Sequence, residues 1–472
     1  MTIRPAAEAR FSVAVPVLIV GAGACGLTAA LAARDAGAEV MVLERDRTPS
    51  GSTALSSGVI PAAGTRFQRA KGIDDSPALL VADLMAKNKG RSDRRVTARV
   101  AERAGPTLEW LADRHGVPFE VIDGFLYPGH SVLRMHATPK RTGADLMGYL
   151  LAATEAAGIA CVTAAHVVAL FAEDDGRVAG VMLERPDGAT ESIGCGALVL
   201  ACNGYGGNPE MVRRFIPEMG EALYFGHVGN QGDALRWGEA LGGVGRDLGA
   251  YQGHGSVAHP HNILITWALM MEGGFQVNLE GRRFSDETHG YSEQAVEVLR
   301  QPGGVAIDVY DARLHALGQQ FEDYRTAEAA GAIRMASSIH GLATQFGIPP
   351  QALAATLAET REMASGKRSD PFGRDLSARP PLSAPFYGVR VTGALFHTQG
   401  GLEIDSDARV LRRDRSPLPN LLAAGGASRG LSGPDCDGYL SGGGLLAAIT
   451  LGAIAGETAS ASCMEDEGAL KH

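Results

Sequence analysis

The chain has 472 residues, of which 45% are hydrophobic and 20% are charged, close to the usage of ordinary globular proteins. Its formal net charge is -10, and it has no long run of lysine and arginine, which argues against a nucleic-acid or anionic-membrane surface. Its six cysteines lack the spacing of a disulfide framework, a haem attachment or a metal site. The composition predicts a cytoplasmic protein of two or three domains with small-molecule partners and no metal.

The first apolar run, residues 11–26, is a short stretch of β-forming residues that ends in glycines. It lacks the basic region and the cleavage site of a signal peptide, and it is too short to span a bilayer. We therefore expect neither a targeting segment nor a transmembrane helix.

The next residues predict a strand, a glycine turn, a helix and a second strand. The strands are expected at residues 15–20 and 39–43, and Glu44 ends the second strand. The glycines of the turn are Gly21, Gly23 and Gly26, in the spacing G-x-G-x-x-G. This spacing permits a tight turn and lets backbone N–H groups approach a pyrophosphate, while Glu44 is placed to accept a ribose hydroxyl. The pattern predicts a site for an adenine dinucleotide.

Three further segments indicate which dinucleotide binds. Residues 44–58 place small and hydroxyl side chains directly after the acid, and residues 196–217 and 419–430 each predict a buried strand that runs into glycines. A nicotinamide cofactor normally needs a single βαβ unit. Glycine loops spread over the whole chain therefore favour FAD.

Several blocks carry a resemblance to a known superfamily. They are "ACNGYGGNPEM", "NQGDALRWGEALGG" (230–243), "FQVNLEGRRFSDE" (275–287) and "FHTQGGLEID" (396–405). In sequence and order they resemble the soluble fumarate reductases, the flavoprotein subunit of succinate dehydrogenase and the bacterial ketosteroid dehydrogenases. The similarity extends over almost the entire chain.

The resemblance implies an α/β fold, a Rossmann-like FAD-binding domain of the glutathione-reductase type with an inserted α+β capping domain. The expected boundaries are 1–249 and 394–472 for the FAD-binding domain and 250–393 for the capping domain, with substrate held between the flavin ring and the cap. Ser52 stands before Thr53 where covalently flavinylated members have histidine, so the FAD is expected to be non-covalent. The electron acceptor or donor is left unidentified, and a homo-oligomer is compatible with the sequence.

The matched motifs also give the residues expected around the FAD. These are Gly21, Gly23, Ala24, Gly26, Glu44, Arg45, Ser52, Thr53, Ser57, Gly58, Ala201, Asn203, Gly204, Asp233, Gly425, Gly426, Ser441, Gly442 and Leu445.

The superfamily transfers a hydride between flavin N5 and a carbon of an activated C–C bond, while the protein polarises the substrate. By resemblance, "YQGHGS" places Gln252 and His254 at the mouth of the substrate pocket. His397, in "FHTQGG", matches the position that grips a substrate carboxylate in fumarate reductases. For His254, a surface or core role is the alternative.

Departures from fumarate reductase are equally informative. That enzyme clamps a dicarboxylate with guanidinium groups, which match carboxylate geometry and charge. Here Tyr439 replaces the arginine that precedes the Leu-Gly-Gly frame. Glu287 is kept as a substrate-site residue, but residues 289–291, His-Gly-Tyr, replace the arginine downstream of it. Two guanidinium positions are therefore lost.

In ketosteroid dehydrogenases a tyrosine occupies the place of Tyr439, and the glycine four residues on, here Gly443, offers its N–H to the ketone oxygen. A phenol and a backbone N–H form an oxyanion hole without a full positive charge. The activating group is therefore expected to be a ketone. The match of His397 to a carboxylate-binding position implies that the substrate also carries a carboxylate. Together the two features predict an oxo-cycloalkane carboxylate as one substrate. The alternative is that Tyr439 only packs beneath the flavin ring.

The group that moves the proton is less well defined. Arg313 is a candidate from a loosely matched block, with a surface ion pair as the alternative. Tyr127 and Tyr251 are second candidates for the base, and His136 either touches substrate or supports its loop.

Three functions follow, in order of preference. The first is FAD-dependent α,β-desaturation of a cyclic ketone, either ketosteroid-like or an oxo-cycloalkane carboxylate. The second is reduction of a small unsaturated carboxylic acid, anchored by His254, His397 and Arg313. The third is a non-catalytic flavin-binding redox protein.

Overall fold

The computed structural model describes residues 2–469, with side chains through residue 464. It divides into two compact units. Unit 1 comprises residues 1–216, 226–251 and 397–472, and unit 2 comprises residues 217–225 and 252–396. The roles predicted for the domains, FAD binding and capping, stay predictions.

Unit 1 is built on a nine-stranded mixed sheet. Its central strands are parallel, and strands 8, 9 and 10 form an antiparallel meander beside them. The strands, in sheet order, are β1 (Thr2–Pro5), β8 (His166–Ala172), β9 (Val178–Glu184), β10 (Thr190–Leu200), β2 (Val13–Val20), β3 (Val40–Leu43) and β7 (Ala160–Val162), with β21 (Pro417–Ala423) on β10 and β20 (Arg409–Leu411) on β21.

Helices and short strands complete unit 1. The helices are α1 (Ala24–Asp35), α2 (Gly51–Ala54), α3 (Arg66–Ala70), α4 (Pro77–Lys87), α5 (Arg94–His115), α6 (Gly143–Ala156), α7 (Pro209–Phe215), α8 (Asp233–Ala240) and α15 (Gly443–Ala469). A three-stranded sheet joins β4 (Ile60–Pro61), β6 (Met135–Ala137) and β5 (Glu120–Val121), and β12 (Gly245–Arg246) pairs with β19 (Gly401–Leu402).

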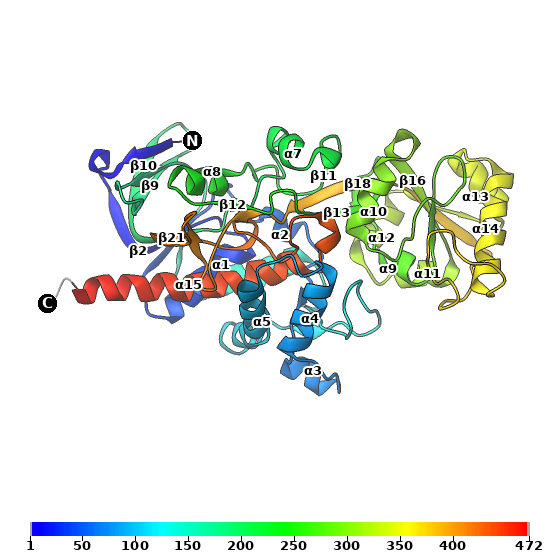
Figure 1. The fold of residues 1–472 in the computed structure, drawn as a ribbon, viewed down its shortest axis with the longest axis horizontal. Helices are drawn as coiled ribbons and strands as arrows, with labels where there is room; N and C mark the ends of the chain where they lie inside the picture. Colours follow the sequence, from blue (N-terminus) through cyan, green and yellow to red (C-terminus); the bar gives the residue numbers. More distant parts are fainter. Residues whose placement is uncertain (1, 470–472) are drawn as a thin grey trace. The chain divides into compact units, whose positions relative to one another are not determined.

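Helix α15 lies along α1 within unit 1 (Figure 1). Among the described residues, its segment Gly443–Met464 alone is long and apolar enough to cross a membrane by length and composition. However, 67% of its apolar window is buried inside the protein. A Cβ on Gly452 would come within 2.5 Å of the Cys25 carbonyl oxygen of α1, so the two helices pack closely. This burial is typical of a core helix, and the cytoplasmic setting stays a prediction.

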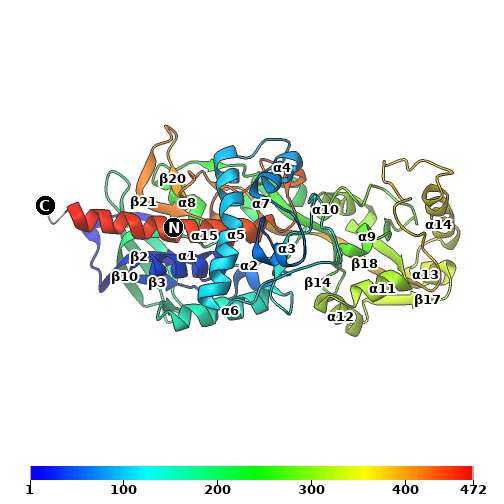
Figure 2. The same cartoon turned by 90° about the horizontal axis from the view of Figure 1, so that it is seen from below.

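Unit 2 contains a seven-stranded sheet with helices around it. The strands are β11 (Leu223–Tyr224), β13 (Tyr251–Ala258), β14 (Ile263–Leu264), β15 (Phe275–Val277), β16 (Val305–Asp311), β17 (Ile333–Ala336) and β18 (Phe386–Thr398). The helices are α9 (Ala268–Met271), α10 (Tyr291–Leu299), α11 (Ala312–Gly318), α12 (Glu322–Ala329), α13 (Ile339–Phe346) and α14 (Pro350–Ala364). Helix α13 packs against α14 and β17 (Figure 2).

The first strand, helix and second strand form as predicted. The strands β2 and β3 pair in parallel through Val17–Val40 to Val20–Leu43, and α1 connects them. β2 is β-branched and buried at its carboxyl end, whereas the alanine-rich α1 is buried along nearly its whole length. The mixed α/β fold is confirmed, and the glutathione-reductase-type detail stays a prediction.

Candidate functional site

The turn between β2 and α1 forms a glycine cradle. Gly21 adopts φ +105°, a conformation that favours glycine. A Cβ on Gly26 would overlap the Gly21 carbonyl oxygen, so helix and strand pack closely only without one. Gly23 caps α1 without a side-chain hydrogen bond. The N-terminus of this twelve-residue helix therefore presents backbone N–H groups to an anion.

Glu44 lies beside this cradle at the end of β3. Its carboxylate accepts the N–H of Ala22 at 2.8 Å and the N–H of Asp46 at 2.9 Å. Thr53 Oγ1 accepts the Ala24 N–H at 3.2 Å. A glycine-lined helix terminus next to a fixed carboxylate fits the pyrophosphate and ribose of FAD.

The three predicted glycine loops come together in unit 1. A Cβ on Gly21 would lie 2.6 Å from the Ala201 carbonyl oxygen, and one on Gly425 would lie 3.2 Å from Cys25. Asn203 has φ +64° and accepts the Gly204 N–H at 2.8 Å. Segments far apart in the sequence therefore meet around the start of α1.

Two predicted cofactor residues have protein partners. Arg45 donates to the Gly229 carbonyl at 3.1 Å, which fixes the loop after β11. Ser52 Oγ accepts the His227 N–H at 3.1 Å and Asn230 Nδ2–H at 2.9 Å. Arg45 therefore holds the loop that contains Gly229, and a role for it in cofactor binding stays a prediction.

Other predicted cofactor residues lie on neighbouring elements. Gly58 has φ +66° and abuts the Thr142 carbonyl, and Gly442 has φ +77° beside Pro61. Asp233 begins α8 and pairs with Arg236 at 3.0 Å. The positions of Ser57, Gly426 and Leu445 fall in the loops and helix already described.

Tyr439 and His397 lie together in unit 1. Their rings are 6.0 Å apart and nearly perpendicular at 85°. The Gly444 N–H donates to Tyr439 Oη at 3.5 Å, whereas the Gly443 N–H donates to the Leu440 carbonyl at 2.9 Å. Gly443 was predicted to donate to the substrate, but its N–H already has an acceptor in this turn.

Gly444 was not singled out from the sequence. A Cβ there would overlap His397 Nε2, so only glycine lets the imidazole approach the start of α15. Its signal in the sequence is the third glycine of the run 442–444, which the pattern alone does not separate from the other two.

His397 is held through both ring nitrogens. Gln399 Nε2 lies 2.9 Å from Nδ1 and 3.1 Å from Nε2, and the Thr398 carbonyl lies 3.2 Å from Nδ1. Burial lowers the pKa of His397 to about 4. The imidazole is therefore neutral at pH 7 and carries one N–H. A carboxylate that replaced one of these partners would accept a hydrogen bond from it and would not form an ion pair.

The remaining predicted residues of unit 1 are more deeply buried. His136 is 0% exposed, with Nε2 2.8 Å from Thr65 Oγ1 and Nδ1 2.9 Å from the Arg134 carbonyl. These partners favour the structural alternative for His136. Tyr127 packs on the small core around Met135, and Tyr251 is 0% exposed.

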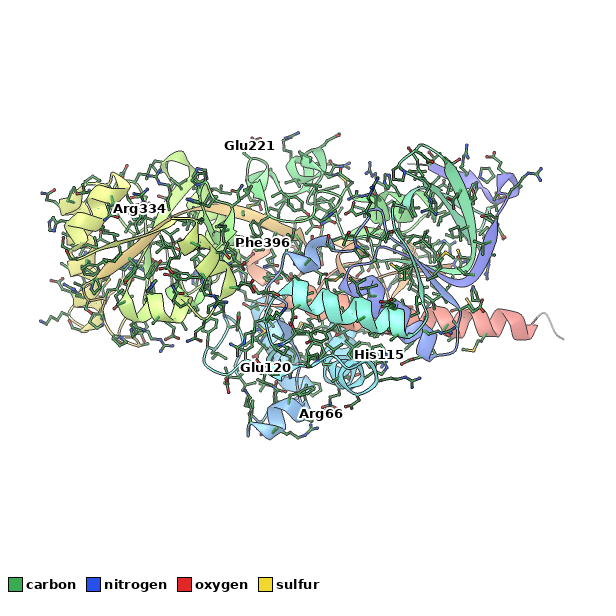
Figure 3. All side chains as sticks on the ribbon, turned by 180° about the vertical axis from the view of Figure 1, so that it is seen from behind. Arg66, His115, Glu120, Glu221, Arg334 and Phe396 are labelled. Atoms are coloured by element: carbon green, nitrogen blue, oxygen red, sulfur yellow. The ribbon has the colours of Figure 1, made fainter. Side chains whose placement is uncertain are left out.

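In unit 2, His254 lies in an aromatic cluster. Its ring stacks on Tyr291 at 4.9 Å and on Phe396 at 5.4 Å, and it meets Trp267 edge-on at 5.7 Å. Phe396, on β18 (Figure 3), also stacks on Phe225 at 4.8 Å. Such a wall suits a flat or cyclic apolar group.

The hydrogen bond at His254 sets its tautomer. Nδ1 accepts the Ser256 N–H at 3.1 Å, and burial lowers the pKa of His254 to about 3. The neutral ring therefore carries its proton on Nε2, where it donates. Tyr291 stacks on His254. The sequence indicates it only as part of the segment that replaces an arginine, because no characteristic spacing links it to His254.

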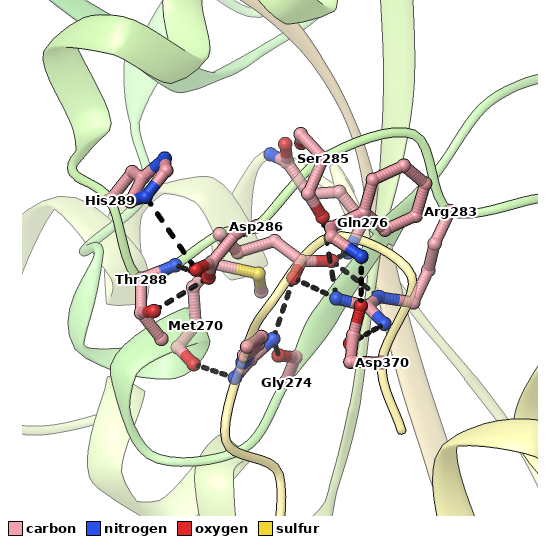
Figure 4. Close-up of polar contacts among 12 residues, drawn as sticks. Met270, Gly274, Gln276, Arg283, Ser285, Asp286, Thr288, His289 and Asp370 are labelled. Carbon is pink, nitrogen blue, oxygen red and sulfur yellow. Dashed lines mark hydrogen bonds and ion pairs between the residues drawn. The ribbon is translucent and has the colours of Figure 1, made fainter. Parts of the chain in front are cut away.

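Glu287 anchors a buried ion-pair network rather than lying open. Its carboxylate pairs with Arg283 at 2.7 Å and Arg374 at 2.8 Å, and it accepts the Gln276 N–H at 3.0 Å. Arg283 also pairs with Asp370. Figure 4 shows Gln276, Arg283 and Asp370 of this network. Burial alone would raise the pKa of Glu287, but the two guanidiniums outweigh it and lower that pKa.

Sequence reasoning missed Arg374, because it lies 87 residues from Glu287 in a segment without a motif. It also donates to the carbonyls of Gly274 and Met270. Both arginines of this network are therefore occupied by protein acceptors.

The other predicted residues of unit 2 are at its surface or edge. Arg313 is exposed on α11 and donates to the Glu272 carbonyl at 2.9 Å. Gln252 is half-buried near the start of β13. Neither position excludes or assigns a catalytic role, and both stay predictions.

Four histidines whose pKa is lowered by burial make the protein acid-sensitive. Burial lowers the pKa of His130, His136 and His397 to about 4 and that of His254 to about 3. Their unfolded pKa is about 6.5, so the unfolded chain binds more protons below it, and each histidine costs about 2 kcal/mol of stability at pH 5. Asp308, whose pKa burial raises to about 7, acts oppositely and offsets roughly one histidine.

We therefore expect stability to fall by about 5–6 kcal/mol between pH 8 and pH 5. Urea unfolding at pH 8, 6.5 and 5 measures this change, with the loss concentrated below pH 6.5. A free energy of unfolding that is constant or rises on acidification would contradict it.

A family comparison identifies the class of protein. Residues 16–444 match the family described as FAD binding domain, and the chain belongs to this family of FAD-binding proteins. It is an FAD-dependent oxidoreductase with relatives among the fumarate reductases, an enzyme that acts on CH–CH groups. The predictions of FAD and of a relationship to fumarate reductases are thereby confirmed, and the non-covalent attachment of the FAD stays a prediction.

Individual relatives include both a reductase and a dehydrogenase. The chain is 30% identical to an NADH:fumarate oxidoreductase of Klebsiella pneumoniae over 94% of its length, and it spans 47% of that longer protein. It is 26% identical to a 4-oxocyclohexanecarboxylate 2-dehydrogenase of Sinomonas cyclohexanicum, covering 96% of this chain and 94% of the relative.

Solved structures show the same fold. The open form of a flavocytochrome c3 fumarate reductase matches with a TM-score of 0.82 at 28% identity, covering 97% of this chain and 80% of the other. A 3-ketosteroid-Δ4-(5α)-dehydrogenase of Rhodococcus jostii shares the fold at 24% identity, with a TM-score of 0.77 over 98% of this chain and the whole of the other.

Proposed function

We propose that the enzyme desaturates a cyclic ketone at its α,β bond, with an oxo-cycloalkane carboxylate as the preferred substrate class. When bound, FAD supplies the redox chemistry by accepting the hydride. The chain's own residues hold the ketone, bind the second polar group and move the proton.

The observation that carries the proposal is the pair of Tyr439 and His397 at the start of α15. A phenol that receives the Gly444 N–H at 3.5 Å is a stronger donor toward a ketone oxygen on which negative charge develops. The neutral imidazole beside it, at 6.0 Å between rings, supplies a second polar position. One ketone and one carboxylate match this pair better than two carboxylates.

Charge supports the same choice. A dicarboxylate needs cations, but Arg283 and Arg374 are engaged by Glu287, Asp370 and backbone carbonyls. The similarity to a 4-oxocyclohexanecarboxylate dehydrogenase over most of both chains supports this substrate class.

For the proton, we propose His254 or Tyr291. The two rings stack at 4.9 Å, and the Nε2–H of neutral His254 and the hydroxyl of Tyr291 each carry a proton that can be transferred. Arg313 stays a third candidate, with an exposed side chain.

The test is anaerobic titration of the holoenzyme with cyclohexanone, 4-oxocyclohexanecarboxylate and succinate, followed at the flavin absorption band. We expect the keto acid to bleach the band fastest, cyclohexanone to bleach it more slowly and succinate not at all. Bleaching by succinate alone would contradict the proposal.

A second candidate is reduction of a small unsaturated carboxylic acid. The resemblance of the His397 block to fumarate reductases and the 30% identity to a fumarate oxidoreductase favour it. Reoxidation of the photoreduced enzyme by fumarate, with no reaction of the keto acid in either direction, would establish this candidate instead.

A further inference from the structure

A second segment of unit 1 is joined to the turn that carries Tyr439. His130 Nε2 lies 2.9 Å from the Ser441 carbonyl oxygen, to which its N–H donates, and Ser441 Oγ donates to the Pro128 carbonyl at 3.2 Å. The partners are more than 300 residues apart in the chain. The two bonds run in opposite directions, so each segment donates once and accepts once.

Close packing surrounds this pair of hydrogen bonds. Gly129 has φ +82°, and a Cβ on it would lie 2.6 Å from Leu440 Cδ1. The His130 N–H closes a turn onto the Tyr127 carbonyl at 3.2 Å. The loop 127–130 is therefore shaped to lie directly on residues 440–441.

The protonation state of His130 decides which of its ring nitrogens donates a hydrogen bond. The residue is 6% exposed, and burial lowers its pKa to about 4, so the neutral ring has a single N–H. Because that N–H is donated to Ser441, Nδ1 is an acceptor, and it has no partner among the described residues. A buried acceptor without a partner costs free energy. The ring bears this cost at Nδ1 while its Nε2–H holds the Ser441 carbonyl.

The segment before Tyr439 is held independently. Asn88 Nδ2 donates to the Leu431 carbonyl at 2.9 Å, Arg91 pairs with Asp435, and Lys89 pairs with Asp437 at 2.5 Å. These contacts fix residues 431–437. Residues 440–441 depend on the loop 127–130 instead.

We propose that His130 is a positioning residue, which holds the Ser441 carbonyl and thereby sets the turn that presents Tyr439 and the Gly444 N–H. This inference rests on the proposed function, because it assigns His130 a part in the orientation of the ketone donor. His130 itself need not touch substrate.

Two substitutions separate its hydrogen bond from its bulk. His130→Gln keeps an N–H donor at the position of Nε2, and His130→Leu keeps volume without a donor. For the leucine variant we expect kcat for keto-acid oxidation to fall by about 100-fold with KM within about 3-fold, as for a misplaced catalytic group. The glutamine variant should recover most of the loss.

A readout without turnover distinguishes failure of this inference from failure of the proposed function. Amide hydrogen exchange of the holoenzyme should accelerate in residues 439–446 for His130→Leu, and for Ser441→Ala to a smaller degree, while residues 431–437 keep wild-type exchange. Wild-type exchange in 439–446 of the leucine variant would overturn the inference even if ketones are substrates. If the leucine variant does not fold, His130→Asn, whose shorter amide side chain does not reach the Ser441 carbonyl, is measured instead, and wild-type exchange in 439–446 of that variant overturns the inference.

Discussion

Replacing Tyr439 by phenylalanine is expected to lower kcat/KM for a cyclic ketone by about 30-fold or more, equivalent to about 2 kcal/mol of transition-state stabilisation. The substitution removes one hydroxyl and leaves a ring of nearly the same volume, 4% exposed and edge-on to His397. The loss is expected because the phenol donates to an oxygen on which charge develops during the reaction. The packing role of the ring would survive.

Stopped-flow reduction of the holoenzyme measures this effect directly. The half-buried Tyr149 on α6 gives a matched control, and Tyr149→Phe should retain wild-type rates. Both variants should bind FAD fully, because phenylalanine keeps the ring that would pack beneath the flavin if packing were the role of Tyr439. Wild-type turnover of Tyr439→Phe with full flavin content would remove Tyr439 from the mechanism.

The sequence was sufficient to predict the parts of the fold that short local motifs determine. The glycine spacing at 21–26 and the acid at Glu44 follow from the geometry of a βαβ unit, and the structure contains β2, α1 and β3 with only small differences in their bounds. The glycine loops after β10 and β21 meet this turn, because parallel strands end at the same edge of their sheet.

What the sequence could not supply depends on contacts between distant residues. Arg374 and Asp370 complete the network of Glu287, and His130 reaches Ser441 from the other end of the chain. None of these pairs has a characteristic spacing. Gly443 and Gly444 differ only in which acceptor each amide meets, a distinction that depends on the exact turn.

Replacing Glu287 by glutamine is expected to destabilise the protein by about 3–5 kcal/mol, because it leaves a buried guanidinium without its counter-charge. The side chains of Glu287 and Arg374 are 1% and 2% exposed. Arg283 retains Asp370, but Arg374 keeps only backbone carbonyls. The loss should exceed that of an ordinary hydrogen bond, since burial denies the remaining charge to water.

Urea unfolding measures this loss, and the exposed Glu280 of the same unit supplies the control, with Glu280→Gln expected to stay within about 0.5 kcal/mol of wild type. A double variant, Glu287→Gln with Arg374→Met, should recover part of the stability because it removes the uncompensated charge. If the network instead serves substrate binding, Glu287→Gln would keep its unfolding midpoint and lose affinity for substrate. That outcome would restore Glu287 to the substrate site in which its sequence motif first placed it.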